Sequence, residues 1–204
     1  MNFAPYKFFG VRGCGFAYVS ERVAALPHHK LIAKDQSIFE LGTSAPANFA
    51  AAMEIINYVA KIGSRYINST DKKALFDEGM HRIHLHERAL LYRLLEGSER
   101  VPGLRHIPGV KVFVDTDDLC ARDLIVAIAI DGTDFTECVA EYQRRGVTVY
   151  ERVNTSIYSK RILDALGIEG AIRVSPLHCH GTDDIDEFLR ITAEMAADAS
   201  ARCS

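Results

Sequence analysis

Residues 124–150 read LIVAIAIDGTDFTECVAEYQRRGVTVY, and this stretch decides the fold. It opens with an apolar run over 124–130 whose length and β-branched residues predict a buried strand. A helix is predicted over 134–145, because Thr133 can cap its start and Gly146 can end it. The β-branched residues of 147–150 predict a further strand. The stretch therefore predicts a strand, a helix and a second strand.

Similar patterns continue on both sides of this stretch. Residues 110–114 and 171–175 predict two more strands, and residues 158–166 predict a short helix ended by Gly167. A last helix opens at Thr182 with an acidic first turn, which suits a helix N-terminus. The order strand, strand, helix, strand, helix, strand, helix predicts an α+β fold. We expect a small, mostly antiparallel sheet with helices on one side.

Residues 48–96 predict helices rather than strands. Apolar spacing indicates a helix over 48–62 ended by Gly63, with Ser44 or Thr43 as its cap, and a longer helix over 71–96. The weakest pattern lies near 68–70. We therefore expect a domain boundary there, with residues 69–204 forming a small C-terminal α+β domain and residues 1–68 a separate N-terminal part.

Composition excludes several classes of partner. With 24 basic and 27 acidic residues the net charge is −3, which gives no attraction for nucleic acid or an anionic membrane. The apolar runs are shorter than a membrane span, so a soluble, cytoplasmic protein is expected. Five scattered cysteines without a Cys-x-x-Cys pair favour reduced thiols. His81 and His84 share a helix face, but charged neighbours favour a solvated surface, and we expect no structural metal.

A lysine among aromatic residues is the first candidate for chemistry. Residues 5–19 read PYKFFGVRGCGFAYV and lead into a strand predicted over 15–19. Aromatic neighbours would remove water from the ammonium of Lys7 and favour the free amine that Schiff-base chemistry needs. On composition alone, a lysine so close to the N-terminus is a solvated surface residue. The residues themselves leave both interpretations open.

Three further positions could bind or react. Arg173 stands in mid-strand, where its guanidinium either pairs with an internal carboxylate or is offered to an external one. Gly42 and Thr43 precede an apolar helix, where a hydroxyl and free N–H groups serve as a cap or as an anion site. Cys179 lies between two histidines, which would favour its thiolate if they were charged.

The sequence resembles a known family at three of these segments. Tyr6-Lys7-Phe8-Phe9-Gly10, followed by Gly-x-Gly-aromatic, resembles the cofactor-lysine segment of class V aminotransferases and cysteine desulfurase-like enzymes, which are pyridoxal-phosphate enzymes of fold type I. The segments Phe-Glu-x-Gly-Thr at 39–43 and Arg-x-Ser at 173–175 are similar to later motifs of the same family. The resemblance implies pyridoxal 5'-phosphate as the cofactor and an amino acid as the substrate.

The resemblance also implies a role for each site residue. Lys7 would form the Schiff base with the cofactor, and Arg173 would bind the substrate carboxylate. Thr43, with Gly42 beside it, would contact the cofactor phosphate of a partner subunit, which implies a homodimer. Persulfide-forming desulfurases carry a cysteine ahead of the arginine, and residues 152–158 contain none. Desulfuration, transamination and epimerisation, and hence a lyase or a transferase, all stay open.

The resemblance extends over residues 7–189 but matches only the C-terminal half of a family member. Residues 1–68 would then be a remnant of the large cofactor-binding domain, and residues 69–204 the small domain. A separate chain, or a longer gene product, would supply the other half, and this chain alone would be inactive. The alternative is a catalytically incomplete fragment that acts only as a self-associating α+β domain.

Overall fold

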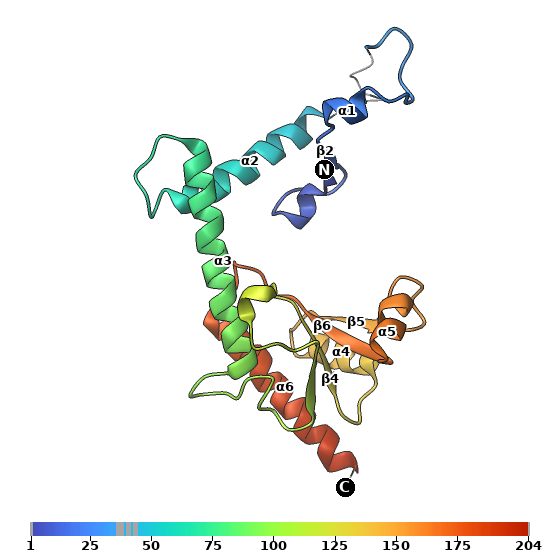
Figure 1. Cartoon of the computed structure of the whole chain (residues 1–204). Coiled ribbons are helices and arrows are strands. Elements are labelled where there is room, and N and C mark those ends of the chain that lie inside the picture. The colour runs from blue at the N-terminus through green and yellow to red at the C-terminus, as the bar shows by residue number, and fades with distance from the viewer. Residues whose placement is uncertain (1, 36–38, 40–41, 43–44, 204) are drawn as a thin grey trace. The chain divides into compact units, whose positions relative to one another are not determined.

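The computed structural model describes residues 2–35, 39, 42 and 45–203. These form two compact units, Met1–Arg82 and Ile83–Ser204, and helix α3 (Lys72–Glu96) contributes to both (Figure 1). The boundary predicted between residues 68 and 69 falls in the segment that joins α2 (Pro46–Gly63) to α3. That this boundary separates a large-domain remnant from a small domain stays a prediction.

Short elements open the first unit. Strand β1 (Asn2–Phe3) pairs antiparallel with β2 (Phe16–Ala17), and the rings of Phe3 and Phe16 stack with centroids 5.6 Å apart. Between them lies a 3-10 turn, η1 (Pro5–Lys7), and after them the single helical turn α1 (Glu21–Ala24). The strand predicted over 15–19 is thus only two residues long, because its sole partner in the described chain is the two-residue β1.

Helices α2 and α3 approach each other through glycines. A Cβ on Gly79 would collide with the backbone oxygen of Val59, and a Cβ on Gly63 with that of Leu75. Only glycine allows the backbones to come this close. Helix α2 begins at Pro46 with Ala45 at the N-cap, so no side chain caps it. The predicted caps Thr43 and Ser44 lie outside the described residues.

The second unit contains a four-stranded sheet. Its strands are β3 (Val110–Phe113), β4 (Val126–Ile130), β5 (Tyr150–Val153) and β6 (Gly170–Val174), arranged in the order β3-β4-β6-β5. All three pairings are antiparallel. Along the chain the strands alternate with α4 (Phe135–Arg144), α5 (Lys160–Leu166) and α6 (Thr182–Cys203), and η2 (Leu119–Ala121) precedes β4. The predicted α+β fold is confirmed.

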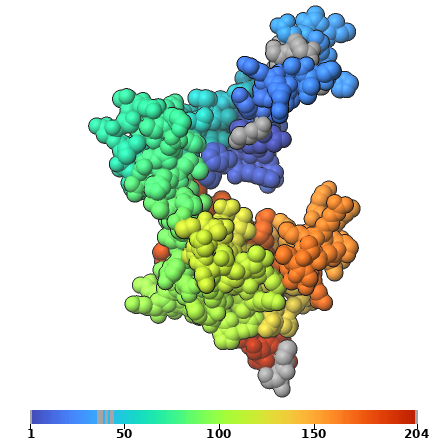
Figure 2. Space-filling model, in the orientation of Figure 1, coloured from blue at the N-terminus to red at the C-terminus, as the bar shows by residue number. Residues whose placement is uncertain are grey.

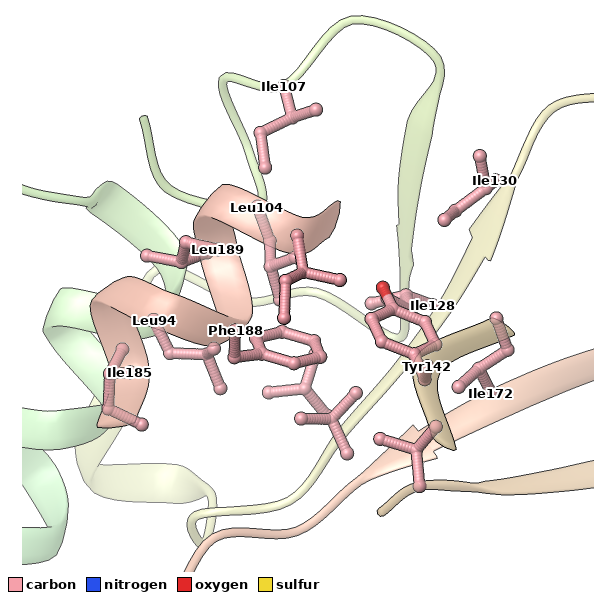
Figure 3. Packing of buried hydrophobic residues seen from close by; sticks show 14 of the residues in the cluster. Leu94, Leu104, Ile107, Ile128, Ile130, Tyr142, Ile172, Ile185, Phe188 and Leu189 are labelled. Carbon is pink, nitrogen blue, oxygen red and sulfur yellow. The ribbon is translucent and has the colours of Figure 1, made fainter. Parts of the chain in front are cut away.

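The core lies between one face of this sheet and the helices. The alternate residues Val126, Ile128 and Ile130 of β4 are buried, as are Ile172 and Val174 of β6. Against them pack α4 and α6, whose Tyr142 and Phe188 rings stack with centroids 5.4 Å apart (Figure 3). Leucines of α3 complete the cluster: Leu90, Leu91, Leu94 and Leu95.

Two local predictions were wrong. Asp134, not Thr133, caps α4, because its carboxylate accepts hydrogen bonds from the N–H groups of Thr136 and Glu137. The Thr133 hydroxyl donates instead to the Ile130 carbonyl oxygen. The third strand lies at Tyr150–Val153 rather than 147–150, because the N–H of Val147 donates back to Tyr142 and closes the helix end.

The Ala-rich segment near the C-terminus, which reads as a tail in the sequence, continues α6 as a helix to Cys203.

Among the described residues, none of the helices combines the length and the apolar character needed to cross a membrane.

Candidate functional site

Lys7 ends the 3-10 turn η1 and is exposed to solvent. Its ammonium nitrogen lies 5.9 Å from the ring centroid of Tyr6. The rings of Phe8 and Phe9 stack on each other, with centroids 5.1 Å apart, so the aromatic residues contact one another more than they cover the amine. The side chain is therefore accessible to a ligand from solvent.

A cavity of about 830 Å³ adjoins this lysine. That volume is within the range that small-molecule sites occupy. Its walls come from η1 and the β1–β2 pair, and its lining residues are Asn2, Phe3, Ala4, Lys7, Phe8, Gly15, Phe16 and Ala17. A primary amine beside phenyl rings fits an aromatic aldehyde such as pyridoxal phosphate. No carboxylate stands among these lining residues to pair with a pyridine nitrogen.

The proposed phosphate contacts are described in part. Gly42 is exposed, and a Cβ built on it would meet no atom within 4 Å, so its surroundings are open. Thr43 lies outside the described residues. The role of both residues stays a prediction.

Arg173 lies in the middle of β6, between β4 and β5. It pairs across the sheet with Ala127 on one side and with Tyr150 on the other. Its Nε atom is buried and has no hydrogen-bond partner among the described residues. Other arginines of this unit are held by carboxylates, as Arg93 is by Asp186. Arg173 therefore has an unused donor, which suits an external anion.

The sheet face that carries Arg173 is basic. Directly paired residues share a face, so the register places Lys111 of β3 and Arg152 of β5 on the same side as Arg173. We call these three the basic face. The strands' other residues on this side, all within the described part of the chain, are apolar or aromatic: Phe113, Ala127, Ala129, Tyr150 and Ala171. None of them is a carboxylate that could neutralise the cations.

Sequence reasoning missed Arg152. The strand was predicted over 147–150, which left Arg152 in a loop, whereas β5 extends to Val153. Arg152 pairs with Ala171, two residues before Arg173, and so lies diagonally across from Arg173 on the same face. The alternation of Tyr150 and Arg152 was the available signal. A strand extended by three residues would have placed Arg152 correctly.

The loop around Cys179 gives little support for a reactive thiol. Cys179 is exposed, and its sulfur lies 4.0 Å from Nδ1 of His180. The same Nδ1 lies 2.9 Å from the backbone nitrogen of Leu177 and 3.2 Å from its oxygen, so the backbone already engages it. Burial, together with His86 and His180, lowers the pKa of His178.

No metal centre is found in the part of the chain that the structure describes. There, no three residues of the types His, Cys, Asp and Glu are grouped so as to hold an ion. Glu87, near the histidines of α3, has a raised pKa chiefly because of its burial and secondarily because of Asp123.

Lys7 belongs to the first unit and Arg173 to the second. Each is described within its own unit, and that they serve a common site stays a prediction. Within the second unit the structure does bring Arg173 together with Tyr150 and places both on the face opposite the core.

Comparison with known proteins identifies the fold. No family model matches the sequence, and no curated protein matches it. The apo cysteine desulfurase from Thermococcus onnurineus NA1 superposes with a TM-score of 0.72 at 18% identity, over 97% of this chain and 46% of that chain. The S-sulfonic acid form of the cysteine desulfurase CsdA from Escherichia coli gives 0.67 at 16% identity, over 97% and 45%. A NifS-like protein gives 0.66 at 18% identity, over 96% and 45%.

The chain therefore spans less than half the length of the solved structures it resembles. It has the fold of the C-terminal part of cysteine desulfurases, with their small antiparallel sheet. The resemblance read from the sequence is confirmed at the level of the fold.

Proposed function

We propose that this chain is the C-terminal part of a pyridoxal-phosphate-dependent enzyme that acts on an amino acid, of the cysteine desulfurase-like or class V aminotransferase kind. The observation that carries the proposal is Arg173, a mid-strand arginine whose buried Nε has no partner among the described residues. A substrate carboxylate would satisfy that donor and balance the charge of the basic face. The fold shared with cysteine desulfurases supports the same assignment.

Residues of the first unit would hold the cofactor. The amine of Lys7 would bind its aldehyde carbon, and the rings of Phe3, Phe8 and Phe16 would surround its pyridine ring. Thr43 with Gly42 would contact the phosphate of the cofactor held by the partner subunit. When bound, pyridoxal phosphate withdraws electrons from the α-carbon of an amino acid. These contacts use one amine, apolar ring faces and a hydroxyl, each of a type that the cofactor's corresponding group requires.

The chain's own side chains would perform two tasks. Arg173 would bind the substrate's α-carboxylate through two parallel N–H···O bonds and so fix the orientation of the α-carbon. Lys7, once its amine is free, would take the proton from that α-carbon. Epimerisation would return the proton to the α-carbon and transamination would deliver it to the cofactor. Desulfuration would also need an acceptor for the sulfur, and residues 152–158 hold no cysteine for that.

The same proposal also covers the oligomeric state, the other half of the fold and the cellular location. Thr43 reaching the phosphate of a partner subunit requires a homodimer, and the other half of the fold comes from a longer product or from a separate chain. The site is that of a cytoplasmic enzyme with no nucleic acid or membrane partner, in keeping with the net charge of −3.

A second candidate is a catalytically incomplete domain that only associates with itself. The observation that favours it is the number of large apolar side chains exposed on the first unit: Phe3, Tyr6, Phe9, Val11, Tyr18, Val23, Leu26, Leu31, Ile32, Phe39, Phe49, Met53, Ile56, Tyr58 and Tyr66. On the second unit the segment around α5 projects outward (Figure 2) and exposes Tyr158 and Ile162. Where exposed side chains of this kind form a contiguous surface, they mark protein contacts.

Titration with pyridoxal phosphate separates the two candidates. If the enzyme proposal holds, an absorbance band near the visible edge appears once the other half of the fold is supplied, and borohydride then fixes the cofactor onto the peptide containing Lys7. The variant Lys7→Arg loses that label, while Lys30→Arg, which removes another exposed lysine of the first unit, keeps it. Equal labelling of all exposed lysines, unchanged in Lys7→Arg, would count against the enzyme. Concentration-dependent sedimentation without specific labelling would favour the self-associating domain.

A further inference from the structure

We infer that Tyr150 is a positioning residue for Arg173, and that its ring holds the guanidinium with the N–H edge presented to a carboxylate. The inference rests on the proposed role of Arg173 in carboxylate binding and adds a second residue to that site. Neither the sequence nor the comparisons assign Tyr150 a role.

The two residues are direct cross-strand neighbours. Tyr150 opens β5 and pairs with Arg173 of β6, so both side chains leave the sheet on the same face. The guanidinium carbon lies 5.8 Å from the centroid of the Tyr150 ring, within the distance at which a cation is attracted to an aromatic face. Tyr150 itself is 55% exposed, so its ring stands on the surface rather than in the core.

An aromatic neighbour orients an arginine in a way that a carboxylate does not. Arg93 is fixed by Asp186, which accepts hydrogen bonds from both its Nε and an Nη and so consumes the edge of the guanidinium. A ring attracts the face of the guanidinium and leaves the N–H donors of the edge free. Among the described residues Arg173 has no acceptor for its Nε. Tyr150 therefore stabilises the side chain while keeping it available to a ligand.

The other neighbours of Arg173 make such support necessary. Across β4 its partner is Ala127, whose methyl group offers neither an acceptor nor a ring to the guanidinium. Arg152, diagonally across on β5, and Lys111, on β3, carry the same charge on the same face and repel Arg173. Without the ring the guanidinium would turn away from these cations toward solvent. Of its two cross-strand partners among the described residues, Ala127 and Tyr150, Tyr150 is the aromatic one.

The test measures carboxylate binding without any cofactor. The Nε–H resonance of Arg173, identified through its loss in Arg173→Lys, is followed by NMR in the 15N-labelled chain while L-alanine is added at constant ionic strength. We compare the native chain with Tyr150→Phe, which keeps the ring, and with Tyr150→Thr, which keeps a good strand former without it. Phe113→Leu, which removes the ring beside Lys111 on the same face, is the matched control.

The expected result is a saturable shift in the native chain, nearly equal affinity in Tyr150→Phe and Phe113→Leu, and affinity about two- to fivefold weaker in Tyr150→Thr. Backbone amide shifts of β4 and β6 should stay in place in every variant, which shows that the sheet is intact. If Tyr150→Thr binds as the native chain does, the positioning role is wrong while the carboxylate site stands. If the native chain shows no shift at all, the carboxylate site itself is wrong.

Discussion

The hydroxyl oxygens of Tyr142 and Thr192 lie 2.7 Å apart, and neither residue has any exposed surface. Thr192 donates its own proton to the carbonyl oxygen of Phe188, so Tyr142 is the donor to Thr192. Burial raises the pKa of Tyr142 well above its ordinary value. The pair joins α4 to α6 across the core, and Tyr142 depends on Thr192 for its hydrogen bond, whereas Thr192 also has its bond to Phe188.

Because of that dependence, removing the hydroxyl of Tyr142 and removing the hydroxyl of Thr192 should cost different amounts of stability. Tyr142→Phe removes the donor and should lower the free energy of unfolding by about 1 kcal/mol. Thr192→Val leaves the tyrosine hydroxyl buried without a partner and should cost about 1–3 kcal/mol. In the Tyr142→Phe background, Thr192→Val should cost less, because no hydroxyl is then left unpaired. Urea unfolding of the four proteins gives the coupling energy, and strict additivity would contradict the shared hydrogen bond.

The pair of Arg93 and Asp186 predicts a pH dependence. Two hydrogen bonds of 2.7 Å from Arg93 hold the pKa of Asp186 below its ordinary 3.8. As the pH falls, the carboxylate of Asp186 is therefore protonated in the unfolded chain before it is protonated in the folded chain. The stabilisation is complete above about 3.8 and is lost as the pH falls through the lowered value.

Arg93→Met should cost about 1 kcal/mol at neutral pH and should flatten the loss of stability below pH ~4. Arg93→Lys should have a stability between those of the native chain and Arg93→Met. Lysine keeps the positive charge but cannot donate two parallel hydrogen bonds as a guanidinium does. Arg190, whose pairs with Glu187 and Glu194 lie at the surface, is the control, and Arg190→Met should change stability less. Denaturant unfolding at a series of pH values measures all three. An acid profile unchanged in Arg93→Met would contradict the assignment.

Gly79 tests the contact between α2 and α3. In an isolated helix, glycine to alanine stabilises by about 1 kcal/mol. Here the added methyl group would collide with the backbone of Val59, so Gly79→Ala should instead destabilise the first unit by about 1–3 kcal/mol. Hydrogen exchange of the α2 amides is the measurement, and faster exchange is expected. Gly181→Ala, whose methyl group would come no closer than 3.9 Å to another residue, is the neutral control. Slower exchange in Gly79→Ala would show that the helices do not touch there.

The cysteines should differ in reactivity. Burial raises the pKa of the Cys138 thiol to about 11, and its side chain is in the core. Cys120 and Cys179 are exposed. Iodoacetamide at pH ~8 should therefore modify Cys120 and Cys179 in the folded chain and Cys138 only in denaturant, as peptide mass spectrometry would show. Modification of Cys138 at the same rate as Cys120 in the folded chain would mean that the core of this unit opens freely.

The sequence predicted the second unit well because its patterns are strong and local. β-Branched runs identified three of the four strands within about two residues, and the order of strands and helices predicted the α+β fold. The strand at Tyr150–Val153 was predicted to begin three residues too early. The β-branched residues at 147–149 favour a strand, but they lie before the paired strand begins. Propensity cannot tell where the pairing begins.

The first unit and the site were harder to predict. The contact between α2 and α3 depends on Gly63 and Gly79, and a glycine within a helical pattern does not reveal what it approaches. Likewise, aromatic residues next to Lys7 suggested a covered amine, but in the structure their rings stack on each other. Arg173 was found because it interrupts an apolar strand. Tyr150 was not, because its importance depends on register, which only pairing across the sheet defines.

The side chains of β6 alternate between the two faces of the sheet, so neighbouring residues of this strand have different roles. Ile172 and Val174 face the core and are needed for folding, whereas Arg173 between them faces the other way and contributes nothing to that core. Substitutions at position 173 can therefore change which ligand is bound without lowering the stability of the domain. Substitutions at the flanking positions 172 and 174 would change the packing of the core as well. A lineage that lost its substrate would keep this strand's apolar residues long after its arginine had drifted.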